Sequence, residues 1–417
     1  MCLLATILIT LAALGADQRL IPSARLESGA EVESAEVSHD GKSLVGVVKD
    51  GKQYDLAVWD IPSNARTILV KGADALYVSV SPDGRGLLAC ICTNEAESLR
   101  DMEFIVWDMP SKSKTSLLKL KKTYVSALPG KFSSDGTLVA IPDGFAKKIH
   151  LWKRNAAAKW NALRVLDVGP EADTPKPTLL EIALTPDGKQ ILAMLPLING
   201  TSDDGSLTIQ KWNVTTGQRV PFRMKPMKAF TTMVGQLLFI SGEKTLWIEP
   251  AEGEGGAAVG IDTFSGRRTC ILPFVLTGAL ISPDGRIGAV IEWVYGTTTS
   301  SPATVGFWNF DDATNLRQVT VPSGTERPMG AFTSDSRFFV LAAGRENRYI
   351  HVIDVNKAEA SSSFKAGGHV FDVKKAKVWS SFAVGDPVKG LFLLNSGEIA
   401  AVGTEPKAIV IWKIKTP

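Results

Sequence analysis

Residues 81–108 read SPDGRGLLACICTNEAESLRDMEFIVWD, and this stretch decides the fold. It opens with a Ser-Pro-Asp-Gly turn, continues as an apolar strand and ends in a second strand that closes on Trp-Asp. Relatives of the turn return about every fifty residues along the chain. They are Ser38-His39-Asp40-Gly41, Ser134-Asp135-Gly136, Thr185-Pro186-Asp187-Gly188, Ser282-Pro283-Asp284-Gly285 and Ser334-Asp335-Ser336. A repeat of this length, made only of strands and turns, predicts an all-β fold, a closed β-propeller.

Each turn is followed by two strands, and the second of these ends in Trp-Asp or a related pair. The endings are Trp59-Asp60, Trp107-Asp108, Trp152-Lys153, Trp212-Asn213, Trp308-Asn309, Ile353-Asp354 and Trp412-Lys413. A degenerate fifth copy has the turn Met233-Val234-Gly235-Gln236 and a third strand over 257–263. The copies together predict about eight four-stranded blades. Residues 356–395 could hold an extra hairpin, so seven or nine blades remain as alternatives.

The two ends of the chain are expected to contribute strands to the same blade. The last copy stops after a third strand that ends near Trp412, with no room for a fourth. Residues Arg19 to Leu26 precede the first copy and have no other part in the pattern. We therefore expect this N-terminal strand to complete the last blade and close the ring, which would remove an unpaired sheet edge.

The strand-ending tryptophans are best explained as packing residues. An indole at the same place in each repeat fills the space between neighbouring sheets. The residues to which we assign this structural role are Trp59, Trp107, Trp152, Trp212, Trp308 and Trp412. Cys90 and Cys92 stand two apart in an apolar strand, so both side chains point to one face of the sheet, and we expect buried thiols there.

The first residues form a separate segment. Leu3 to Leu14 is an apolar run that is too short to span a bilayer, and small residues followed by Asp17-Gln18-Arg19 come after it. This layout predicts a secretory signal peptide over 1–16 and a propeller over 17–417 in an extracytoplasmic compartment, periplasmic or secreted. No other segment is expected to span a membrane. A net charge of +3, from 46 basic and 43 acidic residues, is too balanced to indicate a nucleic-acid partner.

The repeats resemble the WD-repeat family over nearly all of the predicted mature chain. The resemblance rests on the Pro-Asp-Gly turns and on the pairs Trp59-Asp60 and Trp107-Asp108; the Gly-His pair of that family is matched only at Gly368-His369. The turns equally resemble TolB-type and other bacterial propeller repeats. The resemblance implies a propeller and a scaffold or recognition role, and no particular partner.

The sequence offers little catalytic chemistry. Four histidines on an axis would be needed for a propeller iron site, but His39 lies in a turn, and His150 and His351 lie in third strands, so only His369 could lie near an inner strand. No Gly-x-Ser-x-Gly nucleophile motif is present. We therefore expect no metal and no cofactor.

These observations favour a non-catalytic binding scaffold over an enzyme. The loops between second and third strands, and between blades, vary in length, and variable loops on a rigid scaffold are where specificity is usually built. The rim that they form carries the candidate binding residues Trp247, Trp293, Tyr295, Arg345 and Arg348. The expected partner is another protein or a component of the cell envelope. The alternative is a propeller hydrolase or lyase with its site in the central funnel.

The predicted signal peptide gives the first test. We expect the mature protein from its native host to begin at Ala16 or Asp17, because the small residues that end the apolar run are the cleavage signal. N-terminal sequencing measures this directly. A cytosolic pool that retains Met1 would contradict the prediction.

Overall fold

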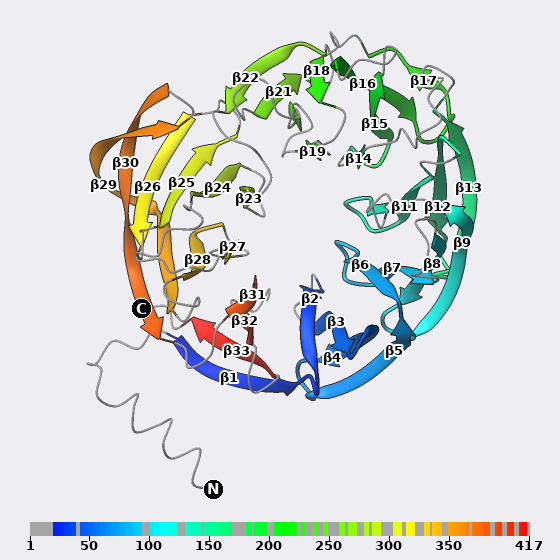
Figure 1. Cartoon of the computed structure of the whole chain (residues 1–417), viewed down its shortest axis with the longest axis horizontal. Helices are drawn as coiled ribbons and strands as arrows, with labels where there is room; N and C mark the ends of the chain where they lie inside the picture. Colours follow the sequence, from blue (N-terminus) through cyan, green and yellow to red (C-terminus); the bar gives the residue numbers. More distant parts are fainter. Residues whose placement is uncertain are drawn as a thin grey trace, which may run out of the picture.

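The structure is a computed structural model of the whole chain, and its described residues contain strands and turns but no helix. The described ranges are 20–38, 42–93, 100–123, 130–143, 146–168, 181–185, 187–197, 204–222, 227–230, 237–239, 245–248, 258–262, 266–272, 279–282, 286–292, 303–310, 314–321, 329–333, 336–343, 349–366, 369–383, 388–393, 398–403 and 408–414. Figure 1 shows the sheets standing side by side around a central axis, which is the arrangement of a β-propeller.

The strands follow one another in antiparallel groups of four, here called blades and named by their strands. The first groups are β2 (Glu31–Val37), β3 (Ser43–Asp50), β4 (Gln53–Asp60) and β5 (Ala65–Ala73); β6 (Ala75–Val80), β7 (Gly86–Thr93), β8 (Arg100–Asp108) and β9 (Ser113–Thr123); β10 (Lys131–Phe132), β11 (Leu138–Asp143), β12 (Lys148–Arg154) and β13 (Trp160–Asp167); and β14 (Glu181–Leu184), β15 (Gln190–Leu197), β16 (Asp204–Asn213) and β17 (Arg219–Val220), with β18 (Met227–Phe230) beside β16.

The second half of the chain repeats the pattern. Its groups are β19 (Leu237–Phe239), β20 (Thr245–Ile248), β21 (Ala258–Asp262) and β22 (Arg268–Leu272); β23 (Ala279–Ile281), β24 (Ile287–Glu292), β25 (Ala303–Asn309) and β26 (Thr314–Val321); β27 (Met329–Phe332), β28 (Phe338–Ala343), β29 (Tyr349–Ala366) and β30 (His369–Ala383); and β31 (Val388–Leu393), β32 (Glu398–Gly403) and β33 (Ala408–Ile414). In each group the first strand lies nearest the axis (Figure 1).

The N-terminal strand β1 (Leu20–Glu27) joins the last group. It pairs antiparallel with β33, from Leu20 opposite Ile414 to Glu27 opposite Ala408, in the sheet order β1-β33-β32-β31. Leu26 is fully buried and packs against the core of the β2–β5 blade, beside Trp59. The N-terminal segment that the sequence assigned to the last blade is thus paired with β33, in the sheet of β31, β32 and β33.

A buried hydroxyl ends each well-described inner strand and ties it to the second strand. The hydroxyl oxygen accepts a hydrogen bond from the first N–H after the turn, at 2.6–3.0 Å. The hydroxyl residues are Ser38, Ser81, Ser133, Thr185, Ser282 and Thr333. In two repeats this residue comes one position before the serine that sequence placed first, since Ser133 and Thr333 precede Ser134 and Ser334.

The aspartates of these turns bond to their own turn, as their spacing predicts. In the β10–β11 turn, Asp135 Oδ1 accepts from Ser133 Oγ at 2.6 Å and from the N–H of Thr137 at 2.9 Å. Gly136 closes the turn with a φ of 66°, a conformation that favours glycine. Asp83 and Asp187 repeat the arrangement in their own turns.

The strand-ending tryptophans lie in third strands, and Trp59, Trp107, Trp152 and Trp212 pack in cores shared by neighbouring blades. The indoles of Trp59, Trp107, Trp212 and Trp308 are buried, whereas Trp152 is half-buried. Trp59 Nε1 also donates to the carbonyl of Glu27 at 3.0 Å, which links β4 to the end of β1. Of Trp412, the structure describes only the backbone position in β33. Cys90 and Cys92 are buried free thiols in the core between the β6–β9 and β10–β13 blades.

The fifth copy was assigned wrongly from sequence. The structure makes Leu237–Phe239 the first strand of its blade and Thr245–Ile248 the second, so Met233 to Gln236 precede the first strand and do not connect the first strand to the second. This repeat lacks the Pro-Asp-Gly turn that fixed the register elsewhere. The shift also moves Trp247 out of the expected rim loop and into β20, opposite Leu238 and Gly260.

Residues 349–383 form a long hairpin, not an extra blade. Strands β29 and β30 pair from Tyr349 opposite Ala383 to Ala366 opposite His369. His369 therefore opens an outer strand, and the expectation that it could lie near an inner strand is wrong. A parallel contact between Gln318 and Lys375 joins this hairpin to the outer strand of the preceding blade. Within the described ranges, no helix is long and apolar enough to cross a membrane.

The β1–β33 pairing gives a stability prediction. We expect deletion of 17–27 to lower the melting temperature and promote self-association, because it exposes an edge of β33. Leu26→Ala should cost about 2–5 kcal/mol, the usual range for a buried leucine. Glu27→Ala, at an exposed side chain of the same strand, is the matched control. A deletion variant that stays monomeric with an unchanged melting temperature would contradict the pairing.

Candidate functional site

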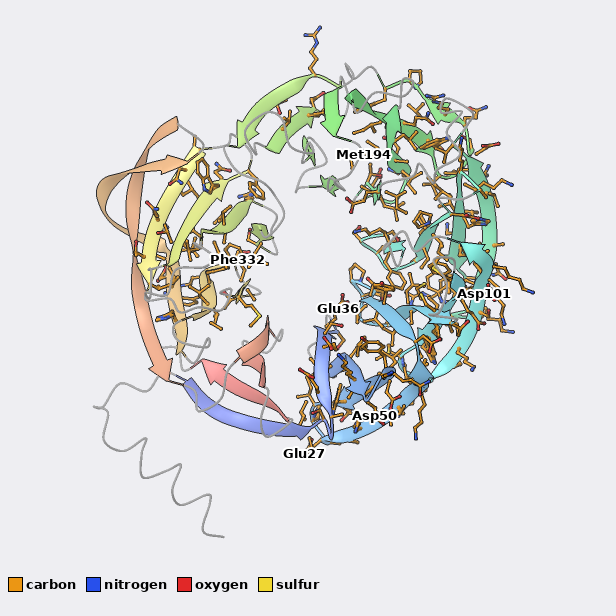
Figure 2. The ribbon with its side chains drawn as sticks, in the orientation of Figure 1. Glu27, Glu36, Asp50, Asp101, Met194 and Phe332 are labelled. Carbon is orange, nitrogen blue, oxygen red and sulfur yellow. The ribbon has the colours of Figure 1, made fainter. Side chains whose placement is uncertain are left out.

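A small cluster of charged residues lies on inner strands of three blades. The position two residues before the buried hydroxyl is Glu36 in the β2–β5 blade and Lys131 in the β10–β13 blade. Since the hydroxyl fixes the register, both side chains leave their strands at the same level. Glu181 begins β14 in the next blade. Figure 2 shows Glu36 at the axial side of the ring.

Glu36 reaches across to the neighbouring blade. Its Oε2 accepts a hydrogen bond from the N–H of Val80, on the inner strand β6, at 2.7 Å. This N–H lies on the axial edge of its sheet, where no further strand can pair with it. The other carboxylate oxygen, Oε1, accepts no hydrogen bond from the described part of the chain.

The pKa of Glu36 is raised above its ordinary value of 4.5. Burial is the main cause, because it disfavours the charged carboxylate. The Val80 hydrogen bond and the positive charge of Lys131 act in the opposite direction and only partly offset the burial. A carboxyl group with a raised pKa that is close to a cation has the properties of a general acid or base.

Lys131 is held by a buried carboxylate. Its Nζ lies 3.4 Å from Oε1 of Glu181, whose side chain is 7% exposed, while the lysine side chain is 43% exposed. The ion pair joins two successive blades, and the lysine charge also acts on Glu36. An ammonium placed in this way can stabilise negative charge that develops on a substrate beside it.

Among the blades whose buried hydroxyl is described, only the β2–β5 and β10–β13 blades have a charged residue at this inner-strand position. Between Glu36 and Lys131, the inner strand β6 presents half-buried Tyr77 and Ser79. At the equivalent inner-strand position, two residues before the hydroxyl, the β23–β26 and β27–β30 blades have Leu280 and Ala331 instead. The charged cluster is therefore a local departure from the repeat.

Of the rim residues chosen from sequence, the structure describes the position of Trp247. Trp247 lies in β20, while Trp293, Tyr295, Arg345 and Arg348 fall outside the described residues. Sequence reasoning missed Glu36, Lys131 and Glu181. The sequence does have a charged residue two positions before Ser38 and Ser133. These charges can be recognised as part of one site only when the register of the inner strands is known.

Comparison with known proteins gives the fold but no family. No protein-family model matches the chain, and no curated protein matches it. Similar solved structures include one described as the eukaryotic initiation factor, at 14% identity and a TM-score of 0.51, which covers 87% of this chain and 92% of that chain. Another is an oligogalacturonate lyase in complex with manganese, at 9% identity and a TM-score of 0.48, with 95% and 97% of the two chains covered. The periplasmic gluconolactonase of Pseudomonas aeruginosa matches at 14% identity and a TM-score of 0.45, with 82% and 96% covered.

These comparisons correct the prediction of a non-catalytic scaffold. The solved propellers that resemble the chain include a lyase and a gluconolactonase, which agrees better with the enzyme alternative than with the scaffold that the sequence favoured. At such low identity the likeness shows the fold and assigns no activity. The activity must therefore be argued from the chain's own residues.

The electrostatic coupling of Glu36 and Lys131 is directly measurable. We expect the carboxyl carbon of Glu36, followed by NMR, to titrate above 4.5. Lys131→Met should raise the pKa of Glu36 further, because it removes a charge that stabilises the carboxylate. Lys148→Met, at an exposed position of β12, should leave it unchanged. A Glu36 pKa at or below 4.5, or one that is insensitive to Lys131, would contradict this geometry.

Proposed function

We propose that this protein is a hydrolase or lyase whose reaction takes place in the central funnel, with Glu36 as the proton-transfer residue and Lys131 as the stabilising cation. The observation that carries the proposal is a carboxyl group of raised pKa, with one oxygen held by the N–H of Val80 and a lysine charge acting on it. Buried carboxyl groups that are kept beside a cation are typical of catalytic acid–base sites.

A hydrolytic step uses these residues as follows. The Glu36 carboxylate takes a proton from water while the water oxygen forms a bond to the carbonyl carbon of an ester or lactone. The carbonyl electron pair moves to its oxygen, whose negative charge is stabilised by the Lys131 ammonium. When the carbonyl forms again, the bond to the leaving oxygen breaks, and the Glu36 carboxyl returns the proton to that oxygen.

A lyase would use the same pair in a different first step. Glu36 would take a proton from a carbon next to a substrate carboxylate, and Lys131 would stabilise the enolate-like charge on that carboxylate. The carbon–oxygen bond at the β position then breaks, a double bond forms, and the leaving oxygen receives the proton. Glu181 acts in both cases as a positioning residue that holds Lys131.

The proposal includes the finer points of the fold and its location. We propose a ring of eight WD-like or TolB-like blades, closed by β1 in the sheet of β31, β32 and β33, and exported by the segment 1–16. The β1–β33 pairing supports closure. The apolar run at the N-terminus, followed by small residues, supports export to the periplasm or the medium.

The purified protein should turn over a member of a panel of esters, sugar lactones and polyuronates. Glu36→Gln should lower kcat by roughly 10²–10⁴-fold, the range for loss of an acid–base residue. Because Gln keeps an oxygen for the Val80 N–H, the local fold should survive. Lys131→Met should also lower kcat, whereas Glu181→Gln should lower it less and Glu33→Gln, at an exposed site of the same strand, should not.

The products distinguish the two reaction types. Uptake of one oxygen from labelled water into the acid product indicates hydrolysis, whereas absorbance from a new conjugated double bond indicates elimination. Full activity of Glu36→Gln on a substrate that the wild type converts would overturn the proposal, as would no turnover of any ester, lactone or polyuronate in the panel.

A further inference from the structure

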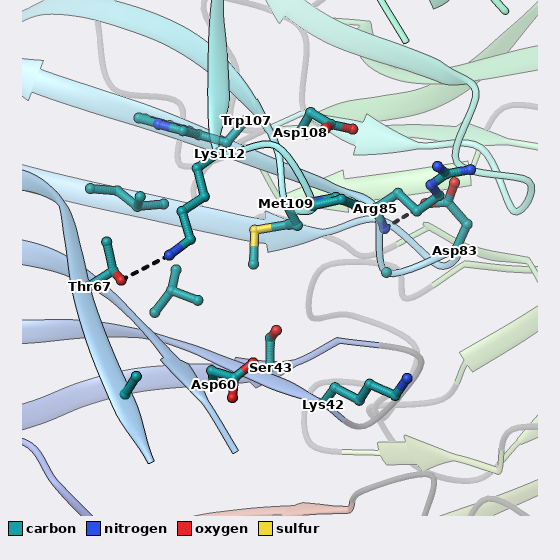
Figure 3. Close-up of a pocket in the computed structure, with 15 residues that line it drawn as sticks. Lys42, Ser43, Asp60, Thr67, Asp83, Arg85, Trp107, Asp108, Met109 and Lys112 are labelled. Carbon is teal, nitrogen blue, oxygen red and sulfur yellow. Dashed lines mark hydrogen bonds between the residues drawn. The ribbon is translucent and has the colours of Figure 1, made fainter. Parts of the chain in front are cut away.

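The two faces of the β6–β9 sheet differ in what lies beside them. One face borders a cavity of about 380 Å³ toward the β2–β5 blade (Figure 3). Carboxylates and cations line this cavity in equal number, namely Asp60, Asp83 and Asp108 with Lys42, Arg85 and Lys112. The other face, toward the β10–β13 blade, contains the sulfur atoms of Cys90, Cys92 and Met102 within one apolar core.

These three sulfur atoms lie close together because of strand alternation and strand pairing. Cys90 and Cys92 are two residues apart in β7, so their side chains leave the same face of the sheet. Met102 stands directly opposite Cys92 on β8, and its Sδ lies 3.8 Å from Cys90 Sγ. A hydrogen bond with the Cys92 thiol is the main cause that raises the pKa of Cys90, and burial adds to it. One thiol therefore contacts both a second thiol and a thioether.

The spacing of the sulfur atoms fits a metal ion better than a disulfide. Alternate residues of a strand are about 6.5 Å apart, beyond the Cβ separation of about 3.5–4.5 Å that a disulfide needs. A metal–sulfur bond is about 2.3 Å long, so two sulfur atoms that share one ion in a trigonal or tetrahedral site lie about 4 Å apart. The 3.8 Å between Cys90 Sγ and Met102 Sδ is close to this separation.

The sulfur group is particular to this blade. Cys90 comes nine residues after the buried hydroxyl, where the other blades with a described hydroxyl have Val47, Pro142, Met194, Ile291 and Ala342. Cys92 comes two residues later, where those blades have Lys49, Gly144, Pro196, Trp293 and Gly344. The core of a blade is therefore built without these thiols elsewhere, and packing alone does not require them.

The group is buried but close to one end of its strands. The side chains of Cys90, Cys92 and Met102 are 2%, 0% and 6% exposed. Thr93 follows Cys92, ends β7 and is exposed, and it pairs with Asp101, which is labelled in Figure 2. An ion can therefore reach the sulfur atoms from this end of the β7–β8 hairpin, one residue from solvent.

The ligand types select a soft ion. Among the described residues, no group of three His, Cys, Asp or Glu side chains could hold a metal ion, so the third ligand here is the thioether of Met102. Zinc sites use Cys, His and carboxylate ligands and almost always four of them. Thiolates together with a thioether favour copper(I).

From this arrangement we propose that Cys90, Cys92 and Met102 form a binding site for a single copper(I) ion. The thiols lose their protons to solvent as the metal–sulfur bonds form, and the thiolate charge offsets the positive charge of the ion in the apolar core. The proposal replaces the expectation of no metal that was drawn from the sequence, where the strand pairing that adds Met102 to the two thiols was not visible.

The test titrates the full chain anaerobically with copper(I) against bathocuproine disulfonate, a chelator whose copper(I) complex is coloured. Cys2→Ala and Cys270→Ala are introduced first, which leaves Cys90 and Cys92 as the only cysteines. One copper(I) ion should bind per chain and shift the NMR signal of the Met102 methyl group. Cys90→Val, Cys92→Val and Met102→Leu should each weaken binding by more than about tenfold, because changes to groups that only support a metal's ligands already cost about 10–100-fold.

Matched substitutions separate loss of the site from loss of the fold. Cys90→Val introduces the residue type of Val47, and Met102→Leu that of Leu207, which precedes Trp212 by five residues as Met102 precedes Trp107. Met194→Leu, at the position equivalent to Cys90 in the β14–β17 blade, should bind copper(I) as the parent chain does.

Four results would overturn the proposal. They are complete transfer of copper(I) to the chelator, binding of zinc(II) as tight as that of copper(I), a Met102 methyl signal that added copper(I) does not move, and unchanged copper(I) binding by the Cys90, Cys92 and Met102 variants with melting temperatures of the parent chain.

Discussion

The buried hydroxyl at the end of each inner strand is the interaction on which the rest of the structure depends. Ser38, Ser81, Ser133, Thr185, Ser282 and Thr333 each accept the first N–H of the second strand. A one-residue slip in a strand would turn every side chain to the other face. The hydroxyl bond opposes such a slip, and so it fixes which inner-strand residues face the neighbouring blade. Without that shared register, Glu36 and Lys131 would not stand at one level.

Most of the fold was predictable because each repeat carries its own turn chemistry. The turns around Asp83, Asp135 and Asp187 and the third-strand position of the tryptophans follow from local rules about side-chain capping and strand alternation. The prediction was wrong in the fifth copy, which has lost the capping residues. Without them, an apolar strand such as Leu237–Phe239 can be read equally well as a first or a second strand.

The candidate site was not predictable by the same means. Glu36, Lys131 and Glu181 come from different repeats, so no motif of fixed spacing contains them. Within any one repeat, the single charged residue looks like an ordinary surface residue. Only the packing of successive blades shows that Glu36 meets Val80, and that Lys131 meets Glu181. In a repeat fold, a polar residue at a position where other blades have Leu280 or Ala331 is the signal to look for.

The carboxyl groups of this protein make opposite contributions to stability, and the contrast bears on function. Burial acts to raise the pKa of Asp135, but the bonds from Ser133 and Thr137 outweigh it and leave that pKa lowered. A lowered folded pKa stabilises the fold above the unfolded value and loses this effect as the pH falls through the folded one.

For Glu36 the sign is reversed. Burial raises its pKa above 4.5, so the fold carries no penalty below that value and becomes less stable as the pH rises through the raised pKa. A structural role would be served at least as well by Gln, which can accept the same N–H of Val80 without a charge to bury. A carboxyl group kept where it costs stability at neutral pH is consistent with the proton-transfer role proposed for Glu36.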